Sequence, residues 1–300
     1  MAKRKNKKVT ANRNYKDTVF RKLFSDRRNL LSLYNAINGT AYTDETKLEI
    51  VTLENAIYMG MKNDLAFIID TNLFLYEHQS TYNPNMPLRD LFYISGEYQK
   101  LVDRKSLYSS ILLKLPAPNF IVFYNGKRKM PDRWTNCLSE SYENQQGEPN
   151  LELKVVTINI NRDCNRKLME QCRILGEYAQ YVEKVRKNAE TMSLDVAVKE
   201  AVDECIQKGI LADFLRVNRA EVIAMSIFEY DKEEEEQKLQ ATYEKIGEKR
   251  GIQIGEKQGE LKKAKSIAIS LAQEGESVER IARILGETEK TIKEWLAETH

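Results

Sequence analysis

The hydrophobic positions in the first third of the chain predict one helix followed by three strands. Apolar residues recur every three or four positions over residues 15–38, and Gly39 then ends the helical pattern. Three shorter runs with the alternation or the length of strands come next, at residues 48–54, 64–69 and 73–79. Turn-forming residues stand between the last two runs, which therefore predict a β-hairpin.

Helix and strand patterns continue to about residue 230. The predicted elements are a helix over 88–112, an apolar strand over 119–124, a polar loop over 131–150, a strand over 153–160 and helices over most of 166–230. Strands interleaved with helices in this way are typical of an α/β layer fold with a mixed sheet.

The composition changes after residue 230. Residues 231–263 are charged, poor in apolar side chains and interrupted by glycine, which predicts a helical or partly disordered linker. Three short helices follow over residues 264–298 and resemble a helix-turn-helix module. The last helix carries Lys290 and Lys293 against Glu289, Glu294 and Glu298, a charge balance that suits phosphate poorly, so interaction or dimerisation is favoured over DNA reading.

The chain thus divides into four predicted segments. They are a basic disordered arm (1–11), a folded domain (12–230), the charged linker (231–263) and the helical module (264–298). The arm, which contains Lys3, Arg4, Lys5, Lys7 and Lys8, is suited either to contact phosphate or to act as a solubilising tail.

The amino-acid composition limits the kinds of catalysis that the chain could perform and indicates its cellular location. The chain has only two histidines, His78 and His300, so catalysis that needs a histidine pair is nearly excluded and must rest on carboxylates, amides, lysines or a metal. The four cysteines form no CxxC pair, which favours reduced thiols over a zinc site. No apolar stretch has the length of a membrane helix or a signal peptide, so we expect a cytoplasmic protein without a membrane partner.

The predicted hairpin brings acidic and amide side chains to one face. With residues 71–72 as the turn, Asp64 lies opposite Gln79; with residues 70–71 as the turn, Asp64 lies opposite Glu77. In both registers the three side chains share a face. Two carboxylates on adjacent strands repel each other without a cation and form an oxygen-rich site suited to Mg²⁺ or Mn²⁺.

These residues carry a resemblance to a known family. Asn63-Asp64 followed by Glu77-His78-Gln79 resembles the bipartite motif of the PD-(D/E)XK nucleases, with glutamine at the lysine position. The surrounding segments KDTVFRKLF (16–24), KNDLAFII (62–69) and YEHQSTYNPNMPLRDLFY (76–93) resemble the Rpn-type recombination-promoting nucleases, also called PD-(D/E)XK nuclease family transposases. The resemblance covers about residues 12–230.

The resemblance implies a fold and an activity. The expected fold is a restriction-endonuclease-like mixed-sheet core with helices on both sides, followed here by a C-terminal helical tail. The expected activity is Mg²⁺- or Mn²⁺-dependent DNA endonuclease cleavage that promotes recombination or serves a mobile element. Asp64 and Glu77 would be metal ligands and catalytic residues together with Gln79, and the backbone carbonyl of His78 a third ligand. DNA is the implied partner, with self-association through the C-terminal helices as a further expectation.

Departures from the family pattern leave alternatives open. Gln79 cannot stabilise negative charge as an ammonium would, so the alternative is a catalytically degenerate member that binds DNA or protein. Asp17 and Lys22 are auxiliary candidates, although Asp17 could simply pair with Arg21 and Lys22 could be a surface lysine. His78 should point away from Asp64 and into packing.

Overall fold

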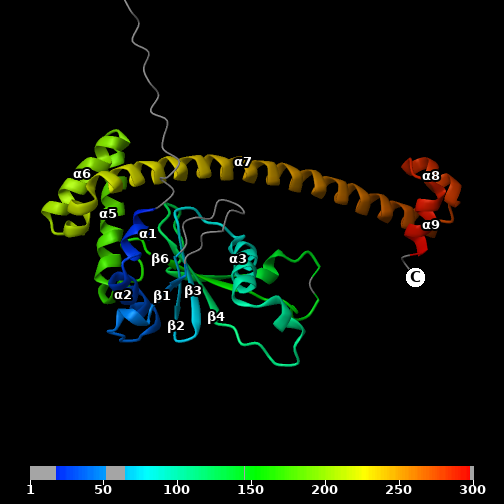
Figure 1. The fold of residues 1–300 in the computed structure, drawn as a ribbon. Helices are drawn as coiled ribbons and strands as arrows, with labels where there is room; N and C mark the ends of the chain where they lie inside the picture. Colours follow the sequence, from blue (N-terminus) through cyan, green and yellow to red (C-terminus); the bar gives the residue numbers. More distant parts are fainter. Residues whose placement is uncertain (1–17, 52–64, 145, 298–300) are drawn as a thin grey trace, which may run out of the picture. The chain divides into compact units, whose positions relative to one another are not determined.

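The computed structural model describes residues 18–51, 65–144 and 146–297 (Figure 1). Two compact units divide the chain, Met1–Glu234 and Glu235–His300. The described part of the first unit is an α/β fold with a mixed six-stranded sheet, which confirms the predicted class. The described part of the second unit is helical.

The sheet combines parallel and antiparallel strands in the order β1-β2-β3-β4-β6-β5. Strands β3, β4 and β6 are parallel neighbours, whereas β1, β2 and β5 join antiparallel. The strands are β1 (Glu49–Val51), β2 (Leu65–Ile69), β3 (Asn72–Gln79), β4 (Ala117–Tyr124), β5 (Arg133–Cys137) and β6 (Lys154–Asn159). The parallel central strands carry long apolar runs because both of their faces are covered.

A two-residue turn sets the register of the β2–β3 hairpin. Ile69 pairs with Asn72, so Asp70 and Thr71 form the turn, with φ values of +46° and +64°. Positive φ at both central positions defines the type I′ turn, whose twist matches that of a hairpin. The structure therefore has the second of the two registers considered, with the turn at residues 70–71.

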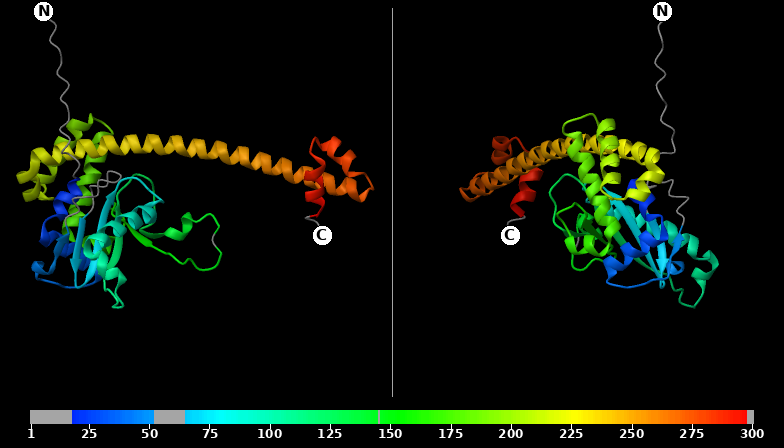
Figure 2. Two further views of the ribbon diagram at one scale, coloured as in Figure 1. Left: turned by 45° about the vertical axis from the view of Figure 1, so that its right-hand side comes forward. Right: turned by 90° about the vertical axis from the view of Figure 1, so that its left-hand side faces the viewer.

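Helices cover the two faces of the sheet. One face is covered by α1, α2 and α5, against which α6 and the first part of α7 pack, and the other face is covered by α3 (Figures 1 and 2). The helices of this unit are α1 (Val19–Phe24), α2 (Arg27–Asn38), α3 (Met86–Leu101), α4 (Arg166–Gln171), α5 (Arg173–Ala189) and α6 (Leu194–Gln207), and α7 (Ala212–Gln273) begins here. Short 3-10 helices occupy Glu45–Lys47, Arg104–Tyr108 and Leu138–Ser141.

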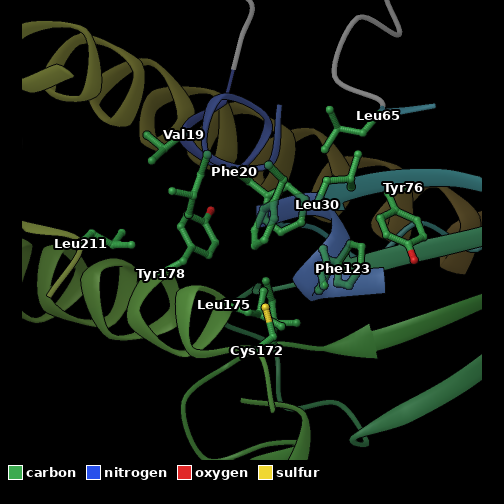
Figure 3. Close-up of a cluster of buried hydrophobic side chains, with 14 of the residues drawn as sticks. Val19, Phe20, Leu30, Leu65, Tyr76, Phe123, Cys172, Leu175, Tyr178 and Leu211 are labelled. Atoms are coloured by element: carbon green, nitrogen blue, oxygen red, sulfur yellow. The ribbon is translucent and has the colours of Figure 1, made fainter. Parts of the chain in front are cut away.

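Aromatic rings contact one another within the larger core cluster, among a majority of aliphatic side chains (Figure 3). The ring centroid of Phe123 lies 5.1 Å from that of Phe20 and 5.2 Å from that of Tyr76, and all three side chains are almost fully buried. Tyr178 of α5 meets Phe20 edge to face at 5.5 Å. Contacts of this kind hold α1 and α5 on the sheet by burial and by ring geometry together.

The helix predicted over residues 15–38 is interrupted. In the described part, α1 ends at Phe24 and α2 begins at Arg27. Asp26 causes the break, because its carboxylate accepts hydrogen bonds from the backbone N–H groups of Arg28 and Asn29 at 3.0 and 3.1 Å and so caps a new helix. Gly39 ends α2 with φ of +65°, as predicted.

Two other predictions need correction. The helix predicted over 88–112 begins earlier, at Met86, and ends at Leu101, because the chain must return along the sheet before β4 can run parallel to β3. The polar loop predicted over 131–150 contains strand β5, which is an edge strand paired only with β6 in the described sheet. A half-exposed edge strand has a weak hydrophobic pattern, which explains why the sequence did not reveal it.

The second unit contains the end of α7, α8 (Val278–Leu285) and α9 (Glu289–Ala297). Helix α7 is continuous through residues 231–263, with a non-helical φ/ψ pair only earlier, at Asn218. The three helices share a small core of Ala268, Ile281, Ala282, Ile292 and Trp295. None of the described helices has both the length and the apolar character needed to cross a bilayer.

Replacing a ring of the main core tests this packing. Phe123→Ala should lower the free energy of unfolding by about 3–5 kcal/mol, because it opens a cavity among buried rings. Phe92→Ala is the matched control, since Phe92 is 58% exposed, and it should change stability by less than about 1 kcal/mol. Urea denaturation measures both, and equal losses would contradict the buried position of Phe123.

The turn conformation gives a second test. Thr71→Gly should raise the free energy of unfolding by about 1 kcal/mol, because a β-branched residue is strained at positive φ and glycine is not. Thr71→Ala keeps the Cβ atom and should gain less. A glycine variant less stable than the alanine variant in urea denaturation would rule out the left-handed conformation at this position.

Candidate functional site

The end of strand β3 sends neighbouring side chains to opposite faces of the sheet. Glu77 and Gln79 lie on the face covered by α3, in the same alternation as Leu73 and Leu75 of that core. His78 lies on the other face, toward α1 and α5. The predicted common face of Glu77 and Gln79 is therefore present.

Glu77 has a buried carboxylate whose two oxygen atoms have different surroundings. The residue is only 8% exposed. Its Oε1 accepts a hydrogen bond from Nε2 of Gln79 at 2.7 Å and forms an ion pair with Nη2 of Arg89 at 3.0 Å. Its Oε2 is buried, and within the part of the chain that the structure describes it has no hydrogen-bond partner. A buried carboxylate oxygen without a partner costs free energy, so a hydrogen-bond donor or a cation at this position would stabilise it.

The first turns of α3 supply the surroundings of Glu77. The sulfur of Met86 lies 2.8 Å from Nε2 of Gln79 and 3.3 Å from Nη1 of Arg89. Asp90 is buried beside this group. Burial, and next the negative charge of Glu77, raise the pKa of the Asp90 carboxyl well above its ordinary value, and the positive charge of Arg89 opposes this rise only in part. Asp90 therefore holds its proton more tightly than an exposed aspartate.

His78 packs in the core on the opposite face, as predicted. Its ring stacks on Phe20 with centroids 5.0 Å apart, and its Nε2 lies 3.1 Å from the hydroxyl oxygen of Tyr178. This arrangement gives His78 a structural role in joining β3 to α1 and α5.

The other predicted site residues are not joined to Glu77 by a described contact. Asp64 and Asp17 lie outside the described residues. Lys22 is on α1 and forms an ion pair with Glu221 of α7, while its role as an auxiliary residue stays a prediction. Over residues 18–51, 65–144 and 146–297, no three His, Cys, Asp or Glu side chains gather as a cation site.

Sequence reasoning missed the contribution of α3. Arg89 and Asp90 lie within the segment 76–93 that resembles the family, but the sequence pattern predicts no role for either of them. A signal was present for Asp90, because it falls on the buried stripe of α3 between Met86 and Ile94, where an acidic residue is unusual. No comparable signal exists for Arg89, whose contact with Glu77 is visible only in three dimensions.

The buried acid on α3 gives a stability test. Because the folded protein raises the pKa of Asp90, it binds this proton more tightly than the unfolded chain does, so stability falls as pH rises from the unfolded pKa toward the folded one. Asp90→Asn removes this effect and should raise the free energy of unfolding more at about pH 8 than at about pH 5. Urea denaturation in EDTA at both pH values measures the difference.

Glu97→Gln is the matched control for Asp90→Asn. Glu97 is a similarly buried acid on α3, but its carboxylate pairs with Lys100 at 2.7 Å, so its replacement should not stabilise the protein at either pH. An equal gain from both substitutions would show that the environment of Asp90 is not special.

The described site thus consists of Glu77 and Gln79 from β3 and of Met86, Arg89 and Asp90 from α3. Its chemistry is that of a buried carboxylate flanked by an amide, a guanidinium and a second acid. Comparison of this chain with models of protein families, with curated proteins and with solved structures gives no match.

Proposed function

We propose that this protein is a Mg²⁺- or Mn²⁺-dependent DNA endonuclease of the PD-(D/E)XK kind that promotes recombination or serves a mobile element. The observation that carries the proposal is the buried carboxylate of Glu77, which keeps one oxygen without a hydrogen-bond partner among the described residues and has the amide of Gln79 beside it. The proposal includes a cytoplasmic location and DNA as the partner. Self-association through the C-terminal helices stays a prediction.

The residues present fit a divalent cation in part. Hard cations prefer carboxylate oxygens, and Oε2 of Glu77 is a buried one that calls for a positive partner. The sequence predicts Asp64 opposite Glu77 when residues 70–71 form the turn, which is where the structure has it. Asp64, which lies outside the described residues, would supply the second carboxylate. Asp64 and Glu77 would then hold the cation together.

A bound divalent cation would polarise the phosphate and lower the pKa of an attacking water. Hydrolysis would form a bond from the water oxygen to phosphorus and break the bond from phosphorus to one ester oxygen. The water would lose a proton to solvent and the departing ester oxygen would take one from solvent, which leaves a phosphomonoester and a free hydroxyl. Gln79 has a position suited to orient the water. Its Nε2 group donates to Glu77, so its carbonyl oxygen is the atom with which it would accept a hydrogen bond from water.

The alternative function is that of a binding protein which keeps the fold without turnover. The neutral amide at position 79 favours this alternative, because it cannot balance the negative charge that develops on the phosphate. The burial of Glu77 favours the enzyme, because a protein that no longer needed this carboxylate would gain stability from an apolar residue at the same place.

Plasmid cleavage tests the proposal. Purified full-length protein should nick supercoiled DNA with Mg²⁺ or Mn²⁺ and not with EDTA. Glu77→Gln and Asp64→Asn should each lower the rate on the order of 100-fold or more, because charge stabilisation by a cation is worth several kcal/mol and each ~1.4 kcal/mol is tenfold. Mn²⁺ should also raise the melting temperature of the wild-type protein and not that of Glu77→Gln.

Glu97→Gln is again the matched control. Glu97 is as buried as Glu77, but it lies about 12 Å further along α3 than Arg89, so cleavage should be unchanged. Failure to cleave by protein that still shifts DNA would favour the binding protein. Cleavage that survives both Asp64→Asn and Glu77→Gln would contradict the assigned site.

A further inference from the structure

We propose that Arg89 supplies, from helix α3, the positive charge that Gln79 lacks, and that its guanidinium binds the phosphate on which the nuclease acts. The inference rests on the proposed function and names a further residue of the same site. It starts from the neutral side chain at position 79 and from the one guanidinium that contacts Glu77 in the described structure.

The side-chain ends of Gln79 and Arg89 occupy the same small space. Both donate to Oε1 of Glu77, at 2.7 Å from Gln79 and 3.0 Å from Arg89. Both also contact the sulfur of Met86, at 2.8 and 3.3 Å. Two groups that share two acceptors are immediate neighbours. The guanidinium therefore lies beside the point where a longer cationic side chain at position 79 would end.

The exposed fractions of Arg89 and Glu77 indicate which end of this ion pair faces solvent. The side chain of Arg89 is 25% exposed and that of Glu77 is 11% exposed, so the guanidinium is the more accessible end of the ion pair. A guanidinium has five N–H donors in a rigid fork, which allows it to hold a carboxylate on one edge and a phosphate on another. An anionic ligand that approaches from solvent would meet Arg89 before it meets Glu77.

The position of Arg89 on α3 adds to this attraction. The helix begins at Met86, with Pro87 in its first turn, and Arg89 lies one turn inside that terminus. The amino-terminal end of a helix carries partial positive charge, which also favours an approaching phosphate. The helix contacts the end of β3 through Met86 and Arg89, so the distance between Arg89 and Gln79 is set by packing rather than by a mobile loop.

A purely structural role for Arg89 is the rival explanation. An arginine beside a buried glutamate can serve only to neutralise it, and its loss would then leave a buried charge unpaired. The two roles differ in their effect on metal binding. If Arg89 only holds Glu77 in place, its loss should weaken metal binding about 10–100-fold. If Arg89 acts on phosphate, removing a positive charge near the metal ligands should leave cation affinity equal or higher.

The experiment compares four variants of the full-length protein: Arg89→Gln, Arg89→Lys, Gln79→Lys and the double variant Gln79→Lys/Arg89→Gln. Plasmid cleavage gives the rate, and calorimetric titration with Mn²⁺ alone gives the metal affinity. We expect Arg89→Gln to cleave on the order of 100-fold more slowly, as after removal of a single transition-state donor, without weaker Mn²⁺ binding. Arg89→Lys, which keeps the charge without the fork, should lose less.

The double variant is the decisive one. It returns a positive charge from β3 instead of α3 and keeps Glu77 paired, so it should fold and should recover cleavage to within about tenfold of the wild type. Arg104→Gln is the control, because Arg104 is an exposed arginine on the short helix after α3, and it should cleave at the wild-type rate.

The outcomes separate this proposal from the function on which it rests. A wild-type protein that does not cleave overturns both. Wild-type cleavage that is unaffected by Arg89→Gln overturns only the role of Arg89. Slow cleavage together with weakened Mn²⁺ binding, or a double variant that folds and stays inactive, would reduce Arg89 to a support for Glu77 and would also overturn the proposal.

Discussion

The register of the β2–β3 hairpin decides which residues face each side of the sheet. The turn at Asp70 and Thr71 fixes the pairing from Ile69–Asn72 onward, and strand alternation carries that choice to the end of β3. A shift of one residue would send the side chain of Glu77 into the aromatic core and that of His78 toward α3. The position of the turn therefore controls both the packing of the core and the composition of the candidate site.

The face under α3 shows how a polar site is maintained in an apolar layer. The carboxylate of Glu77 forms an ion pair with Arg89, and the raised pKa of Asp90 makes a second negative charge beside it less favourable. Both compensating residues come from a helix that packs through Met86, Tyr93 and Ile94. Helix α3 therefore acts at once as part of the core and as half of the site, so the geometry of the site depends on the packing of the layer.

Most of the sheet could be predicted from the sequence because its signals are local. The apolar runs gave β2, β3, β4 and β6, and the turn residues gave the hairpin and the common face of Glu77 and Gln79. The split between α1 and α2 was missed because the cap at Asp26 competes with a continuous apolar pattern. Strand β5 was missed because an edge strand is half polar. The role of α3 in the site could not be predicted, because no periodicity encodes a contact between residues 77 and 89.

The alternation along β3 also places two kinds of physical constraint within one strand. Phe74, Tyr76 and His78 face the aromatic core, so a substitution at these positions changes core packing and therefore stability. Glu77 and Gln79 face α3, where a substitution changes charge and hydrogen bonding at the edge of a smaller core. Chemistry can therefore change at Glu77 and Gln79 while Phe74, Tyr76 and His78 keep the strand packed in the fold.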